Sequence, residues 1–292
     1  MKEAAGNGHI GVVKLLKGWG ATGFDDAMAS AAFGGHAGIV KLCKGWGAEN
    51  VNFAMAYAAR GGQVGVVKLC KKLGAKNFHW AMEEAAWRGH IEIVRLLKGW
   101  GAASFEHAMM GAAEHGHIGI VKLCKEWSAT GFSDAMGSPA RNGHIEIVKL
   151  LKGWGATNFN HAMACAAVGG HTEIVKLCKK WGATRFNDAM VHAARRGHAE
   201  IVKMCKEWGA TNLGTAMWCA MSGGHVRVAA MCRGWLPTWG AIHEELFKYH
   251  HKRRFLRDLE DELLPKTWHP DRFWDWCLDE QEKEMLEECF GG

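Results

Sequence analysis

The sequence predicts an all-α solenoid of stacked helical hairpins, and three observations lead to this prediction. A segment typified by residues 170–183 recurs with a fixed period of 27 residues. Each copy holds two apolar stripes at helical spacing, and glycines separate the stripes. Units of this size bury their apolar faces only against neighbouring copies. The column that marks the nine copies reads His9, His36, Gln63, His90, His117, His144, His171, His198 and His225.

Residues 159–183 illustrate the unit. The first stripe consists of Phe159, Ala162, Met163, Ala166 and Ala167, and the second of Ile174, Val175, Leu177 and Cys178. Both follow the i, i+3, i+4 spacing of an amphipathic helix, so we name them helix A and helix B. Gly169 and Gly170 are suited to end helix A, and Gly182 to end helix B, because glycine accepts the left-handed conformation of a C-cap.

The string G-H-x-x-I-V-K-L-C-K-x-W-G-A, with its preceding Ala pair, resembles the second helix and exit turn of an ankyrin repeat. The resemblance covers about four-fifths of the chain. Ankyrin repeats run to about 33 residues, so each copy here is about six residues short. The resemblance therefore implies an ankyrin-like solenoid of nine 27-residue hairpins that lack β-hairpin fingers and contain little or no strand.

A change of composition divides the chain into a repeat array, residues 1–236, and a tail, residues 237–292. The array has a net charge of +12 and the tail a net charge of −6. Residues 241–264 have the pattern of an amphipathic helix, which predicts a helical C-terminal cap for the array. The string W-H-P-D-R-F-W-D-W-C-L-D-E resembles tails of ankyrin-repeat proteins from giant double-stranded DNA viruses.

Cysteine usage predicts an intracellular protein without disulfides. Leucine replaces cysteine in one helix B column, which indicates a buried apolar position. That column contains Cys43, Cys70, Cys124, Cys178, Cys205 and Cys232. Stacked helices lie about 8–10 Å apart, too far for a disulfide between neighbouring copies. No apolar run approaches the roughly 18 residues of a membrane span.

The sequence contains no nucleophile elbow, P-loop or zincin motif, so we expect no enzymatic activity and no cofactor. The histidines that mark the successive copies form what we call the histidine ladder. Neighbouring histidines of this ladder are too far apart to share a metal ion, which favours a turn-capping role. The recurrent tryptophan, represented by Trp181, is expected to be buried against the next helix A. Pro139 lies within a helix A and predicts a kink or an early end there.

Two basic rows follow helix B. The first contains Lys14, Lys41, Lys68, Arg95, Lys122, Lys149, Lys176 and Lys203; the second contains Lys17, Lys44, Lys71, Lys98, Lys125, Lys152, Lys179 and Lys206. Such rows can follow a phosphate backbone, but a solvated outer face is the favoured interpretation. Nucleic acid is therefore an alternative partner rather than the expected one.

Several helix A positions differ between copies: those one, two, five, six and nine residues after the phenylalanine column. Large apolar residues stand at some of them, as is typical of binding surfaces. We expect a protein or peptide to dock on this face, which in ankyrin proteins is the concave one, centred on Tyr57, Trp80 and Trp87. The full candidate set is Tyr57, Arg60, Trp80, Glu83, Glu84, Trp87, His107, Met110, Asp134, His192, Arg195 and Trp218.

These features together predict a non-enzymatic protein-interaction scaffold, viral in origin and directed at a host protein inside the infected cell. One alternative is a substrate adaptor that recruits a ubiquitin-ligase component through the tail, as poxviral ankyrin proteins do with an F-box-like segment. The other alternative is nucleic-acid binding through the basic helix B face. No membrane partner is expected.

Overall fold

The computed structural model describes residues 1–236, and the predicted tail helix and cap fall outside the described residues. The described part contains 18 α-helices and one short 3-10 helix, and no strand is found within it. The helices pack in neighbouring pairs, one A helix with the B helix that follows it. The prediction of an all-α fold built from helical hairpins is confirmed for residues 1–236.

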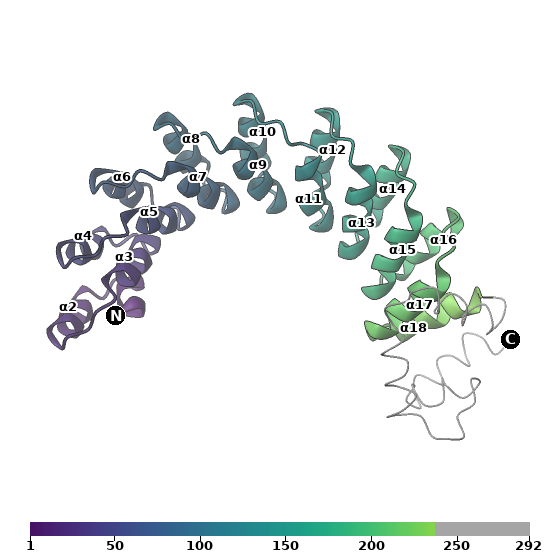
Figure 1. Cartoon of the computed structure of the whole chain (residues 1–292), viewed down its shortest axis with the longest axis horizontal. Coiled ribbons are helices and arrows are strands. Elements are labelled where there is room, and N and C mark those ends of the chain that lie inside the picture. Colours follow the sequence, from purple (N-terminus) through teal and green to yellow (C-terminus); the bar gives the residue numbers. More distant parts are fainter. Residues whose placement is uncertain (237–292) are drawn as a thin grey trace, which may run out of the picture. The chain divides into compact units, whose positions relative to one another are not determined.

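Nine A helices alternate with nine B helices along residues 1–236 (Figure 1). The A helices are α1 (Lys2–Gly6), α3 (Phe24–Phe33), α5 (Val51–Arg60), α7 (Phe78–Trp87), α9 (Phe105–Glu114), η1 with α11 (Asp134–Met136 and Gly137–Arg141), α13 (Phe159–Gly169), α15 (Phe186–Arg195) and α17 (Leu213–Ser222). The B helices are α2 (Ile10–Gly18), α4 (Ala37–Gly45), α6 (Val64–Lys72), α8 (Ile91–Gly99), α10 (Ile118–Glu126), α12 (Ile145–Gly153), α14 (Thr172–Lys180), α16 (Ala199–Glu207) and α18 (Val226–Gly234).

The chain divides into two compact units, Met1–Asn158 and Phe159–Gly292. Unit 1 holds the first six hairpins, and the described part of unit 2 holds the last three. Within each unit, A helices of successive hairpins pack closely against one another, whereas successive B helices touch at few points. The A helices therefore form a continuous layer in each unit.

The core consists of the recurrent alanines and methionines of the A helices and the Val and Cys or Leu columns of the B helices. Met82 and Val94 are both fully buried, and no polar or charged residue is buried in the described part of the chain. Leu97 and Leu151 are as buried as the cysteines they replace, which confirms that column as apolar core. Burial raises the pKa of the Cys70 thiol to about 12, so this thiol stays protonated at neutral pH.

The histidine ladder joins neighbouring hairpins. His117 Nε2 donates to the carbonyl of Trp87 at 3.2 Å, and His144 Nε2 to that of Glu114 at 3.0 Å. The backbone of each histidine occupies the N-cap of a B helix, but the side chain makes no capping bond. The predicted turn-capping role therefore does not hold for the histidine's own turn. The ring instead bonds a carbonyl at the end of helix A in the preceding hairpin.

The approach of this ring also accounts for the glycine in the turn of the hairpin before it, as at Gly116. Gly116 has a φ of +81°, and a Cβ there would lie 2.8 Å from Cε1 of His144 in the next hairpin. Gln63 replaces the histidine in the third copy, and its amide donates within its own turn, to the Gly61 carbonyl at 3.0 Å. The third hairpin therefore lacks the bridge that His36 and His90 make.

A second contact between hairpins starts at the residue after the phenylalanine column. Asn52 Oδ1 accepts the backbone N–H groups of Lys76 and Asn77 at 2.7 and 2.9 Å. The residues that make the equivalent contact are Asp25, Asn52, His79, Glu106, Ser133, Asn160 and Asn187. Each of these seven side chains carries an acceptor, so the residue at this position changes between copies while its hydrogen bond is retained.

The tryptophan column lies against its own hairpin. Phe105 and Trp127 rings are 5.5 Å apart, and the same pairing recurs in five other copies. Trp181 is half-buried, and Trp19 is 73% exposed. The expectation of a buried ring that covers the next helix A is therefore wrong, because the ring packs on the preceding helix A and keeps one side accessible.

The second basic row supplies a third contact between hairpins. A lysine Nζ lies over the tryptophan ring of the next hairpin at distances from 4.1 to 5.5 Å. The pairs are Lys17–Trp46, Lys71–Trp100, Lys98–Trp127, Lys125–Trp154 and Lys179–Trp208. Leu73 interrupts the tryptophan column, and there Lys44 donates to the Ala48 carbonyl at 3.0 Å instead. This row is thus not merely a solvated face.

The sixth hairpin is irregular, as Pro139 predicts. Its A helix begins with the 3-10 segment η1 and continues as the five-residue α11, which contains Pro139. Proline has no N–H to bond to the carbonyl four residues earlier, and its ring crowds that carbonyl. The disruption therefore lies before the proline, at the start of the helix.

Candidate functional site

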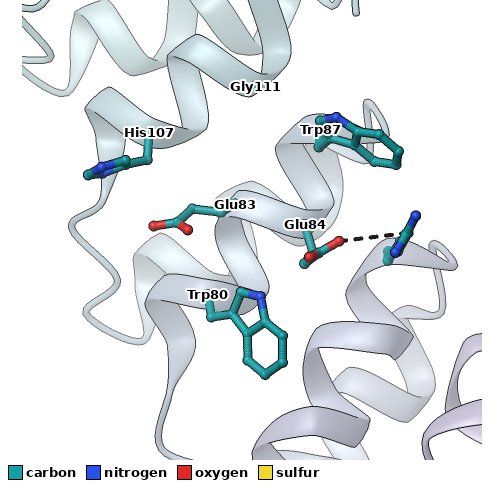
Figure 2. A pocket seen from close by; sticks show the side chains of 7 residues that line it. Trp80, Glu83, Glu84, Trp87, His107 and Gly111 are labelled. Carbon is teal, nitrogen blue, oxygen red and sulfur yellow. Dashed lines mark ion pairs between the residues drawn. The ribbon is translucent and has the colours of Figure 1, made fainter.

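The A-helix layer of unit 1 contains a hollow of about 370 Å³. Its lining residues come from α5, α7 and α9, and Figure 2 shows those of α7 and α9. They are Arg60, Trp80, Glu83, Glu84, Trp87, His107 and Gly111. Six of these seven belong to the set singled out in the sequence, so the structure brings half of that set together at one place.

The side chains of α7 are directed by its buried stripe. Ala81, Met82, Ala85 and Ala86 are fully buried, which leaves the intervening positions on the accessible face of the helix. The helix start is fixed by Asn77, whose Oδ1 accepts the N–H of Trp80 at 3.2 Å. The helix therefore presents Trp80, Glu83, Glu84 and Trp87 from a rigid backbone.

Gly111 makes room for the hollow on the side of α9. The equivalent position carries Tyr57 in the third copy and Glu84 in the fourth. A Cβ on Gly111 would lie 3.7 Å from Cα and Cβ of Trp87, an ordinary van der Waals distance. A larger side chain can therefore be accommodated at its root, and its outer atoms would occupy the hollow.

Arg60, Glu84 and Trp87 form one wall. Arg60 Nε lies 3.8 Å from Glu84 Oε2, and the guanidinium carbon lies 4.8 Å from the centre of the Trp87 ring. The guanidinium carbon of Arg88 lies 4.4 Å from the centre of the same ring. The His115 ring meets the Trp87 ring edge-on, with the two ring centres 4.5 Å apart. Trp87 is thus held by its own neighbours and serves as a fixed surface.

Glu83 and Trp80 form a second, unmatched part of the hollow. Figure 2 shows the Glu83 carboxylate turned away from Glu84, towards the α9 side where His107 lies. Within residues 1–236 Glu83 has no hydrogen bond or ion pair, and no cation lies over Trp80. The ring centres of Trp80 and Phe53 lie 5.7 Å apart, and those of Phe53 and Tyr57 lie 4.5 Å apart.

The two layers of unit 1 have opposite charge. From α3 to α11 the A helices carry two basic residues, Arg60 and Arg141, and seven acidic residues, a net charge of −5. The acidic residues are Asp25, Asp26, Glu83, Glu84, Glu106, Glu114 and Asp134. The six B helices carry 13 basic and three acidic residues, a net charge of +10. The hollow therefore lies on the acidic layer.

The remaining predicted residues are not part of the hollow. Tyr57 joins it only through Phe53, Met110 on α9 is 41% exposed outside its lining, and Asp134 lies on η1. Three others belong to unit 2: His192 and Arg195 on α15 and Trp218 on α17. Arg195 Nη2 lies 3.8 Å from Cys219 Sγ.

Two residues that shape the hollow were missed in the sequence. Phe53 links Tyr57 to Trp80. It occupies the same variable helix A position as Trp80, and a large aromatic residue at that position could have identified it from the sequence. Gly111 also stands in a variable column, but a glycine carries no chemistry that marks it as part of a site. Its role becomes visible only from the space beside Trp87.

Within residues 1–236 no group of three or more His, Cys, Asp or Glu side chains is arranged to hold a metal ion. None of the helices in that part is both long and apolar enough to cross a bilayer. Comparison with known proteins gives no match for this chain, either to a protein-family model or to a curated protein.

Proposed function

We propose that the chain is a non-enzymatic protein-interaction scaffold whose acidic A-helix layer in unit 1 docks a segment of a partner protein. The observation that carries this proposal is the hollow between α7 and α9, where two tryptophans and two glutamates line a surface otherwise built on alanines. Tryptophan and arginine are enriched in the residues that dominate binding energies. Rigid helices hold these side chains in place, which limits the entropy lost on binding.

The basic B-helix layer has a different role in this proposal. Lysines of its second row lie over tryptophan rings of the next hairpin, and this contact supports the stack rather than a ligand. The first row is exposed but carries ion pairs in places, such as Lys149 with Glu146 at 3.1 Å. Nucleic-acid binding therefore has less support than docking on the A layer.

We also propose that the chain is an ankyrin-type repeat protein of viral origin that acts on a host protein inside the infected cell. The support is the ankyrin-like string of each copy and the paired helices with left-handed glycines at their turns, such as Gly101 with a φ of +98°. Proteins built from such repeats use their repeat surface for recognition, which agrees with the placement of the hollow.

The test compares two surface variants of the whole chain in capturing proteins from infected or transfected cells. One is the A-layer double change Tyr57→Ala with Trp80→Ala. The other is a B-layer double change, Lys68→Glu with Arg95→Glu, at exposed positions on α6 and α8. We expect the A-layer variant to lose the captured partner and the B-layer variant to retain it.

Both variants must first show unchanged helical circular dichroism, because Tyr57 and Trp80 share an aromatic cluster with Phe53. If the A-layer variant captures its partner normally while the B-layer variant does not, the docking surface lies on the other layer and the proposal is wrong.

A further inference from the structure

We propose that the partner segment inserts an arginine side chain into the hollow, where its guanidinium lies against Trp80 and pairs with Glu83. This inference rests on the proposed function and specifies the chemistry of the occupant. It follows from an arrangement that the chain already contains on one side of the hollow and leaves incomplete on the other.

The complete arrangement is that of Arg60. Its guanidinium lies 4.8 Å from the centre of the Trp87 ring and its Nε 3.8 Å from a Glu84 oxygen. An arginine between an aromatic face and a carboxylate combines a cation–π contact with an ion pair. The planar guanidinium fits this combination better than the compact lysine ammonium does.

The incomplete arrangement is that of Trp80 and Glu83. They lie three residues apart on α7 and so share one face of the helix. Both are partly buried, and the described residues supply neither a cation for the ring nor a partner for the carboxylate. A partly buried carboxylate without a partner has lost part of its hydration without compensation. An incoming cation compensates for that loss by pairing with the carboxylate.

Size and charge both favour a single long cationic side chain. At about 370 Å³ the hollow is near the lower end of the roughly 300–1,000 Å³ range of ligand sites. The surrounding A layer has a net charge of −5, which attracts a basic segment and repels a phosphate or an acidic one. An apolar side chain would fill the space but leave Glu83 desolvated and unpaired.

The experiment selects peptides from a displayed library of random 12-residue sequences against the whole chain. Each selected peptide is then synthesised with arginine and with citrulline, its neutral isostere, and both affinities are measured by fluorescence polarisation. We expect arginine-rich peptides whose affinity falls on the order of tenfold with citrulline, the loss typical of one charged hydrogen-bonding partner. Affinity should also fall as salt concentration rises.

Three protein variants locate the site. Glu83→Gln removes the charge and should weaken binding by a similar factor, while abolishing most of the difference between arginine and citrulline. Gly111→Leu fills the hollow and should weaken binding without lowering the melting temperature, because leucine favours a helix more than glycine does. The matched control is Glu92→Gln, an exposed glutamate on α8, which should change nothing.

Two outcomes overturn the inference in distinguishable ways. Peptides that lose affinity with Gly111→Leu but are indifferent to citrulline and to Glu83→Gln would place a non-cationic segment in the hollow; the proposed function would survive. Peptides that ignore both Gly111→Leu and the Tyr57→Ala with Trp80→Ala change would show that the A layer is not the docking surface, so both proposals would fail.

Discussion

Ser128 occupies a turn position that its own chain fills with glycine in other copies. Its φ is +72°, and it is the only non-glycine residue with a positive φ in the described part of the chain. The equivalent glycines, such as Gly101 and Gly155, have φ values of +98° and +99°. A side chain in this conformation brings its Cβ close to the following carbonyl oxygen, which costs about 1–2 kcal/mol.

We therefore expect Ser128→Gly to raise the free energy of unfolding by about 1 kcal/mol, somewhat less than the conformational strain because glycine also gains freedom in the unfolded chain. Urea unfolding followed by circular dichroism measures the change. The matched control is Gly155→Ser, where a Cβ would meet no atom within 4 Å, so only conformation is altered. If the free energy of unfolding of Ser128→Gly is equal to or lower than that of the parent chain, Ser128 is not strained.

His117 should make stability depend on pH. Burial lowers the pKa of His117 from its ordinary value of 6.5; the hydrogen bond to Trp87 opposes this, and His115, His90 and His144 add repulsion. The unfolded chain therefore binds the proton more readily than the folded one. The stabilisation from neutral His117 is complete above pH 6.5 and is lost as the pH falls towards the lower, folded pKa.

The measurement is the melting temperature between pH 7.5 and 5.5, which we expect to decline more for the parent chain than for His117→Gln. Glutamine is the replacement that the chain itself uses at Gln63. His107→Gln, at an exposed position in the hollow, is the comparison variant. If the melting temperature of His117→Gln falls as much on acidification as that of the parent chain, the dependence of stability on pH has another origin.

At the scale of elements, contacts between side chains align the edges of successive hairpins. Lys98 Nζ lies 5.1 Å from the centre of the Trp127 ring, so these two residues connect the fourth hairpin to the fifth. Cation–π pairs at exposed sites contribute about 0.5–1 kcal/mol. A double-mutant cycle with Lys98→Met and Trp127→Leu should therefore give a coupling free energy in that range.

The chain supplies the control for this cycle. Lys44 faces a copy with Leu73 in place of tryptophan and bonds to the Ala48 carbonyl instead. Coupling between Lys44→Met and Leu73→Ala should accordingly be close to zero. A coupling of equal size in both cycles would mean that the lysine ammonium gains nothing from the aromatic ring.

The helices were predictable from the sequence, whereas the contacts between hairpins were not. Period, apolar stripes and glycines are local signals, so they located the A and B helices and the irregularity at Pro139. The bridge from His117 to Trp87 spans 30 residues and ends on a carbonyl, which leaves no mark on residue identity. Six residues of the hollow were predictable because they are large or charged, but Gly111 was not, since it acts through the space it leaves.

At the scale of the whole molecule, the two units should open separately. Repeats interact mainly with their nearest neighbours, so a local defect lowers stability within its own cooperative unit. Gly116→Ala in unit 1 and Gly170→Ala in unit 2 are matched defects: φ is +81° and +80°, and the new Cβ would lie 2.8 and 2.6 Å from the next histidine ring.

Hydrogen exchange measured by mass spectrometry should show Gly116→Ala reducing protection in α9 and α10, with α14 to α16 unchanged. Gly170→Ala should give the reverse pattern. If either change lowers protection equally in both units, the described chain unfolds as one cooperative body.

The bridge from a histidine to a main-chain carbonyl, which His36, His90, His117, His144 and His198 make, has a consequence for how such a protein diversifies. Every residue type carries the same carbonyl, so the residue that supplies it near the end of an A helix, Trp87 in one copy and Val168 in another, changes without affecting the bond. The position after the phenylalanine column, whose side chain accepts backbone N–H groups of the next hairpin, is occupied by Asp, Asn, His, Glu or Ser. Duplication, loss or exchange of whole 27-residue repeats by recombination therefore keeps the carbonyl acceptors of these bridges while it rearranges the residues on the surface.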